Sequence, residues 1–257
     1  YGVFLINGTA FLLSAFSEMF IRFPKVVRDE KHIQSSAGQQ FFGSFKEGFA
    51  FVWQNLGLRT IIFFAVALNF LSSPLLGVVF PYFGKEILLL EAQQYGTLQA
   101  MLPVGLLIGT ALIGYLTKRY RKESLLSFGI MMQGGIVVLL GAFAMPSVYG
   151  NFGLPTMLTV MSSVLLGIGV FNVLVNVPFQ VTLQETVPDH YRGRVFGLLD
   201  SMVQMLVPVS MAFSGVLVDY FSVTSLFAFA GIITICLGFA MAMSRNIKLL
   251  YVKEEAA

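Results

Sequence analysis

Long runs of hydrophobic residues alternate with short polar segments along almost the whole chain. A helix needs about 20 apolar residues to cross the hydrocarbon core of a membrane. Seven runs are long enough, and we expect each of them to form a transmembrane helix. They cover residues 1–21, 59–83, 95–117, 124–145, 155–183, 194–219 and 223–244. The pattern therefore predicts an all-α, polytopic transmembrane bundle whose two chain ends lie on opposite sides of the membrane.

Composition supports a membrane protein and excludes several other classes. Hydrophobic residues make up 56% of the chain and charged residues only 11%, too few charges for a soluble surface of this size. The single cysteine lies inside an apolar run, and the two histidines, His32 and His190, lie far apart in polar segments. No nucleotide, metal or acyl-transfer motif occurs. We therefore expect no enzyme activity, no cofactor, no metal site and no nucleic-acid partner.

The positive charges indicate how the chain is oriented in the membrane. All of the 16 Lys and Arg residues except Lys85 follow the first, third, fifth or seventh apolar run or lie at its edge. Because positive loops stay in the cytoplasm, these segments are predicted to be cytoplasmic. The C-terminal tail, residues 245–257, is then cytoplasmic and Tyr1 lies at the outer surface.

Residues 22–58 form the one long polar insert and read as a linker between two membrane units. Apolar residues in its second half recur at helical spacing: Phe41, Phe42, Phe45, Phe49, Val52, Trp53 and Leu56. This spacing predicts an amphipathic helix. Its aromatic face either lies in the inner membrane interface or packs on the transmembrane bundle, and the spacing suits both arrangements.

The six spans after the linker divide into two similar triplets. The middle helix of the first triplet ends with Gly114-Tyr-Leu-Thr-Lys118, and that of the second ends with Gly215-Val-Leu-Val-Asp219, 101 residues later. Since each triplet crosses the membrane an odd number of times, these two ends face opposite sides. This is the sequence trace of an inverted-topology repeat, which many alternating-access transporters contain.

Two motifs resemble those of a known family. The segment Gly114-Tyr-Leu-Thr-Lys-Arg-Tyr-Arg-Lys122 is similar to the loop pattern G-x-L-x-D-R-x-G-R-K of the major facilitator superfamily, with Lys118 in place of Asp and Arg121 in place of Gly. The run from Val187 to Leu199, which contains Arg192-Gly193-Arg194, and the following Gly215-x-Leu-x-Asp219 resemble the macrolide-efflux-like branch of that superfamily.

The resemblance implies a domain map and a function. Residues 1–21 would match helix six of a twelve-helix transporter, 22–58 its central cytoplasmic loop, and 59–244 helices seven to twelve. A chain that begins inside a helix is therefore expected to lack the N-terminal half of its transporter. The implied function is secondary active export of drugs or other amphipathic small molecules, coupled to protons, in a bacterial plasma membrane. A siderophore or metabolite exporter, or a non-transporting membrane receptor or assembly protein, remains an alternative.

Polar residues inside spans are costly and suggest function. Asn172, Asn176, Gln180 and Gln184 recur every fourth residue and place four amides on one face of the fifth span. The stripe lines a substrate cavity or hydrogen-bonds neighbouring helices. Isolated amides, Asn69 and Gln133, are weaker candidates for the cavity.

The sixth span carries Asp200, the one carboxylate well inside a span, one turn before Gln204. It could take up a proton and couple it to transport, or pair with a loop cation such as Arg192, Arg194 or Lys118. Gln204 is a further candidate for the substrate cavity, and Met205 could help to form an adaptable apolar pocket there. The candidates for a gate or loop motif are Gly114, Lys118, Arg119, Arg121, Arg192, Gly193, Arg194 and Asp219.

Overall fold

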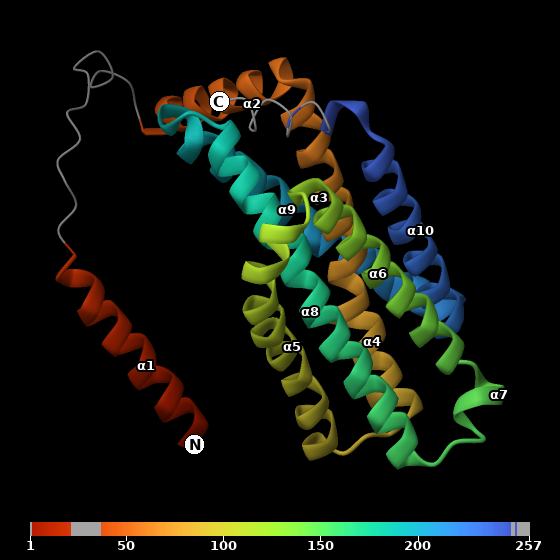
Figure 1. The fold of residues 1–257 in the computed structure, drawn as a ribbon. Coiled ribbons are helices and arrows are strands. Elements are labelled where there is room, and N and C mark those ends of the chain that lie inside the picture. Colours follow the sequence, from red (N-terminus) through yellow and green to blue (C-terminus); the bar gives the residue numbers. More distant parts are fainter. Residues whose placement is uncertain (1, 22–36, 248–249, 251–257) are drawn as a thin grey trace. The chain divides into compact units, whose positions relative to one another are not determined.

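The computed structural model describes residues 2–21, 37–247 and 250, and these residues fold into helices joined by short connections (Figure 1). Seven helices in this part of the chain are long and apolar enough to cross a membrane. They are α1 (Gly2–Met19), the segment Leu56–Ile87, α5 (Ala92–Arg119), α6 (Lys122–Phe143), α8 (Leu154–Thr186), α9 (Asp189–Tyr220) and α10 (Val223–Met243). The all-α bundle and its seven spans are confirmed. The basic first part of the predicted linker and the tail after Ile247, apart from Leu250, lie outside the described residues.

Several helices extend beyond their predicted edges. The sixth predicted span began at residue 194, whereas α9 begins at Asp189. The predicted loop from residue 84 to 94 is also shorter, because helical structure continues to Ile87. Hydropathy marks only the part of a helix within the hydrocarbon layer, while the helix itself continues into the polar headgroup region.

The chain divides into two compact units, residues 1–42 and residues 43–257. In the first unit, α1 buries none of its residues. The second unit holds the last residues of α2 (Ala37–Gln54), all later helices, and the short α7 (Pro146–Tyr149) between α6 and α8.

The first span of the second unit is an interrupted helix. It consists of α3 (Leu56–Pro74), a π-helical segment η2 (Leu75–Val79), a short α4 (Phe80–Tyr82) and a second π-helical segment η3 (Phe83–Ile87). Proline has no backbone N–H, so Pro74 and Pro81 each leave a gap in the α-helical ladder. In η2 and η3 the hydrogen bonds run to the fifth residue, as from Phe80 N–H to the Leu75 carbonyl. Such widened turns are frequent at functional sites.

The six spans pack as two interlocked triplets. The first triplet is the α3 to η3 helix, α5 and α6, and the second is α8, α9 and α10. The middle helix of each triplet packs on the first helix of the other, α5 on α8 and α9 on α3, and the two third helices, α6 and α10, pack on each other. Each triplet thus makes the same set of helix contacts with the other, as expected for the repeat inferred from the sequence.

The two middle helices also bury equivalent positions. Leu98 and Leu199, Gly109 and Ser210, and Ile113 and Ser214 are buried pairs separated by 101 residues. Gly96 and Gly197, Leu107 and Pro208, Ala111 and Ala212, and Gly114 and Gly215 are exposed pairs at the same separation. Each middle helix therefore leaves one face uncovered, and that face is rich in small residues.

Glycines set the closest helix crossings. A Cβ added at Gly105 in α5 would lie 2.2 Å from the Leu166 carbonyl oxygen of α8. Gly109 approaches α8 similarly, which agrees with the spacing of these two glycines. Gly193 and Gly197 of α9 have the same four-residue spacing but behave differently, since an added Cβ at either position has no neighbour within 4 Å in the described chain.

A second close crossing joins α6 and α10 and allows a matched test. An added Cβ at Gly134 would lie 2.7 Å from the Gly231 carbonyl oxygen, whereas the neighbouring Gly135 has nothing within 4 Å. We expect Gly134→Ala to destabilise the protein by about 2 kcal/mol through overpacking. Gly135→Ala adds the same methyl group to open space and should be neutral. The stability of both variants is measured in detergent as the heat-induced loss of the monodisperse gel-filtration peak. Equal losses for the two variants would contradict the close crossing of α6 and α10 at Gly134.

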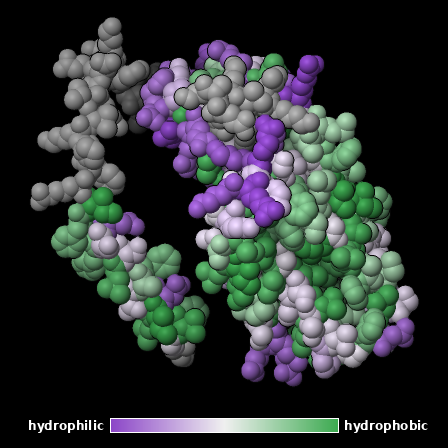
Figure 2. Space-filling model, viewed as in Figure 1, coloured by the Kyte–Doolittle hydropathy of each residue, from purple (hydrophilic) through white to green (hydrophobic). Residues whose placement is uncertain are grey.

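The surface has the distribution expected of a membrane bundle. On the face in Figure 2, hydrophobic residues cover the middle of the bundle, and hydrophilic residues gather at the end where α2 lies. We call this end the basic end because it carries Arg59, Arg192, Arg194 and Arg245. The two larger apolar clusters of the interior lie around Leu58, Leu183 and Val195 and around the edge-packed rings of Phe83 and Phe227. A smaller third cluster contains Ile113, Leu125, Val173 and Leu174.

Candidate functional site

A small cavity of about 60 Å³ lies between the interrupted first span, α6, α8 and α10. Four polar side chains reach an otherwise apolar wall: Ser72, Gln133, Asn172 and Thr234. Leu75 and Leu76, the first residues of the π-helical η2, form part of the same wall. The first and third helices of both triplets therefore surround one small cavity with a partly polar wall.

The volume of the cavity limits what it can hold. A water molecule needs about 10–15 Å³ measured in this way, so the cavity has room for a few waters. Drug-sized ligands occupy pockets of roughly 300–1,000 Å³. A drug-sized ligand therefore does not fit into this cavity.

The predicted amide stripe of α8 is split between two environments. Asn172 is half-buried and lines the cavity, while Asn176, Gln180 and Gln184 are exposed. The Asn176 side-chain Nδ2 donates to Asn172 Oδ1 at 2.9 Å and so connects the two environments. The stripe curves away from the interior because 3.6 residues per turn do not keep every fourth residue in line over about three turns.

On α9, Asp200, Gln204 and Met205 all lie on the uncovered face, and Met205 is 76% exposed. Asp200 has no ion pair among the described residues. The two cations nearest in sequence are engaged elsewhere: Arg192 with Asp189 at 2.8 Å and Arg194 with Glu47 at 2.5 Å. Among the described residues, neither loop arginine therefore pairs with Asp200.

The two remaining amide candidates, Gln133 and Asn69, lie in different places. Gln133 joins Asn172 in the cavity wall. Asn69 is exposed, and its side-chain Nδ2 donates to the Ala65 carbonyl one turn earlier in the same helix at 2.9 Å.

At the basic end, the Arg192-Gly193-Arg194 segment ties three elements together. The Arg192 guanidinium donates to the Gln184 carbonyl at the end of α8 at 2.7 Å. Arg194 pairs with Glu47 of α2 and lies over the ring of Tyr191 at 5.6 Å. Tyr191 in turn stacks on Phe51 of α2 with ring centroids 4.6 Å apart. A second ion pair, Lys122 with Glu185, joins the start of α6 to the end of α8.

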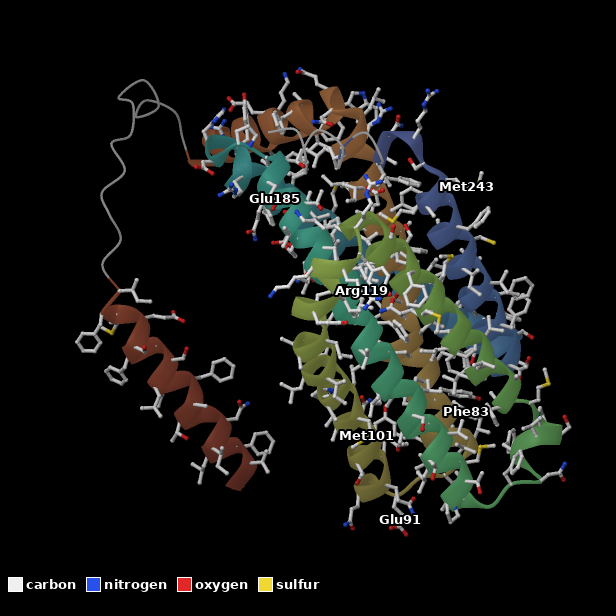
Figure 3. The ribbon with its side chains drawn as sticks, in the orientation of Figure 1. Phe83, Glu91, Met101, Arg119, Glu185 and Met243 are labelled. Carbon is white, nitrogen blue, oxygen red and sulfur yellow. The ribbon has the colours of Figure 1, made fainter. Side chains whose placement is uncertain are left out.

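The other residues of the loop motif lie at the end of α5 and the start of α6. Gly114, Lys118 and Arg119 are exposed, and the Arg119 guanidinium donates to the Tyr115 hydroxyl one turn earlier at 3.2 Å. Arg121 pairs with Glu123 at 3.4 Å. Asp219 lies near the other end of α9, far from this group. Figure 3 shows Glu185 toward the basic end of the bundle and Glu91 at the opposite end.

The sequence interpretation missed the partners of the basic residues. Glu47 lies about 150 positions before Arg194, and Lys122 and Glu185 are 63 positions apart. No local spacing rule relates residues so far apart in the chain. The one usable signal in the sequence was the amphipathic pattern of α2. An apolar helix face must be covered by protein or lipid, so this pattern indicated that α2 could pack on another part of the chain.

Comparison with known proteins places the chain in a family. The family model described as Major Facilitator Superfamily matches residues 1–209 and, in a second overlapping match, residues 62–249. Macrolide efflux protein A of Streptococcus pyogenes is 22% identical over 256 residues, which cover 98% of this chain and 58% of that protein. The multidrug efflux pump Tap of Mycolicibacterium fortuitum is 28% identical over 175 residues, 67% of this chain and 39% of the pump.

A third relative, the uncharacterized MFS-type transporter YfiS of Bacillus subtilis, is 26% identical over 96% of this chain and 57% of its own length. The chain thus spans less than three fifths of the length of these relatives. No solved structure gives a significant match.

Proposed function

This chain belongs to the Major Facilitator Superfamily, and we propose that its six-span bundle is one half of a secondary active transporter that works by alternating access. In this proposal α1 is the last helix of the other half, residues 22–58 are the central cytoplasmic loop, and residues 245–257 are a cytoplasmic tail. The bacterial relatives and the positive residues at the basic end support a bacterial plasma membrane with that end inside.

The uncovered faces of α5 and α9 support the proposal that a second half packs on this bundle. They occupy equivalent positions in the two triplets, and glycines on both, Gly114 and Gly215 among them, have open space where a side chain would be. Small residues on a membrane helix allow another helix to approach closely. We assign these faces to contact with the other half, which moves against this one during transport.

The transport pathway is assigned to the exposed polar groups of α8 and α9. Asn176, Gln180, Gln204 and Asp200 are exposed on helices that are otherwise apolar, and the interior cavity is too small for a substrate. Polar groups in a span face a water-filled space or a polar partner, since lipid cannot satisfy them. This exposed polar face is the observation that carries the proposal.

The substrate class and direction rest on the relatives. One is a macrolide efflux protein and another a multidrug efflux pump. We propose export of bulky amphipathic molecules, with Met205 and other flexible apolar groups of α9 adapting to their shapes. Protons are the proposed coupling ion, and Asp200 the proposed carrier.

An efflux assay with amide variants tests the pathway. In cells expressing the full-length protein, we expect Asn176→Leu with Gln180→Leu to lower the rate of drug efflux about tenfold, the loss of roughly 1.4 kcal/mol of hydrogen bonding to the substrate. Gln93→Leu is the matched control, because Gln93 is an exposed amide in the first turn of α5, outside the proposed pathway. If both sets of variants export equally well, the amide face does not carry substrate.

A further inference from the structure

The second half of α2 has one face against the bundle and another that is bare. On the bundle side, Gly48 and Val52 are buried, and an added Cβ at Gly48 would lie 3.0 Å from the Arg194 carbonyl oxygen. The stacking of Phe51 on Tyr191 and the pairing of Glu47 with Arg194 lie on this side too. These contacts fix the rotation of α2 about its own axis.

The bare face carries three aromatic residues of this part of the helix. Phe45, Phe49 and Trp53 follow one another at four-residue spacing, and Leu56 continues the line into α3. Their exposed fractions are 37%, 43%, 57% and 54%. Phe49 and Trp53 stack with ring centroids 5.3 Å apart. We call these four residues the aromatic stripe.

Two cations flank the aromatic stripe. The Arg59 guanidinium lies 4.8 Å from the centroid of the Trp53 ring, and Lys46 is exposed next to Phe45. Aromatic rings and cations on one helix surface are typical of segments at the boundary between lipid headgroups and acyl chains.

The connection to α3 sets the level of the aromatic stripe relative to the membrane. A single residue, Asn55, separates α2 from α3, and its side-chain oxygen accepts a hydrogen bond from the Leu58 N–H at 3.1 Å. This cap fixes the corner between the two helices. Because α3 begins a membrane span, α2 must lie where that span enters the membrane, and the stripe is continuous with exposed apolar residues of α3 such as Phe63.

We propose that the aromatic stripe is a lipid-binding surface that lies in the interfacial zone of the bilayer, with Lys46 and Arg59 at anionic headgroups. The rotation fixed by Gly48, Phe51 and Glu47 directs the stripe away from the bundle, and the Asn55 corner holds it at headgroup depth. The sequence left two locations open for the aromatic face, and the structure divides it: Phe51 and Val52 pack on the bundle, and the stripe remains for lipid.

Trp53 makes the proposal directly measurable, since it is the single tryptophan of the chain. The full-length protein, with any tryptophan outside this chain replaced by phenylalanine, is reconstituted in phosphatidylcholine brominated either near the headgroup or near the end of the acyl chain. We expect quenching of Trp53 fluorescence to be roughly twofold stronger with shallow bromines. Absence of quenching by both lipids would show that protein or water covers the stripe, and stronger quenching by deep bromines would exclude an interfacial position. Either result overturns the proposal.

Charge variants test the preference for anionic lipid. Adding phosphatidylglycerol should displace the Trp53 emission maximum to shorter wavelength, and Lys46→Gln with Arg59→Gln should abolish that displacement. The control is Lys85→Gln, because Lys85 lies over the Tyr95 ring at 4.9 Å, a similar cation–aromatic pair in a different part of the bundle. A displacement that survives the double substitution, or that Lys85→Gln removes equally, contradicts the assignment of the two cations.

Discussion

Gly105→Ala is expected to destabilise the protein by about 3 kcal/mol, the upper end of the range for overpacked cores. The added Cβ would lie 2.2 Å from the Leu166 carbonyl oxygen and 3.0 Å from the Gly169 Cα. Both are backbone atoms, so no rotamer change can relieve the clash. Helices α5 and α8 would have to separate along their whole crossing, which loosens every contact between them.

The measurement is the midpoint of heat-induced aggregation of the full-length protein in detergent, where we expect a fall of roughly 10 °C. Gly135→Ala is the control, because Gly135 lies in a neighbouring span, away from the uncovered faces of α5 and α9, with nothing within 4 Å of an added Cβ. Alanine favours a helix over glycine by up to about 1 kcal/mol, so this variant should be neutral or slightly more stable. A Gly105→Ala protein as stable as Gly135→Ala would show that the two helices do not cross here.

Asp200→Asn is expected to abolish uphill drug efflux while leaving downhill equilibration of the substrate intact. Asparagine keeps the size of the side chain and removes its ability to exchange a proton. In the described chain Asp200 is exposed on α9 and has no ion pair, so its charge is available to respond to the proton gradient. Asp200→Glu keeps the carboxylate and should retain coupled transport.

The assay follows drug accumulation in cells with and without a protonophore. Wild-type cells should gain drug when the protonophore is added, by at least about tenfold in steady state if coupling supplies 1.4 kcal/mol or more. Cells with Asp200→Asn should already hold the higher level, with no further gain. Protonophore-sensitive efflux by Asp200→Asn would assign proton coupling to another group. It would leave the alternating-access proposal itself standing.

The helices of this protein were predictable because each depends on a local property. A run such as residues 124–145 is apolar over its whole length, and lipid satisfies no backbone polar group, so the chain must form a helix there. The 101-residue repeat was likewise visible from two short motifs. Leu98 and Leu199, which are separated by the same 101 residues, are both buried.

The candidate site was only partly predictable. The amide spacing on α8 indicated one stripe, but the position of neighbouring helices decides that Asn172 lines the cavity and Gln180 does not. In a membrane, apolar residues suit lipid and protein neighbours equally well, so hydropathy cannot tell a packed face from a lipid-facing one. The same ambiguity concealed the difference between Gly105, which is packed, and Gly197, which is open.

The sequence by itself determined that this protein is a helical membrane bundle, where its spans run, and which loops carry positive charge, since these depend on the solvent properties of the bilayer. The tertiary structure decided which glycines touch, which side of α2 is covered, and that Arg194 pairs with Glu47 rather than with Asp200. Those outcomes depend on distances between residues remote in the chain, and packing geometry fixes them only when all six spans are assembled.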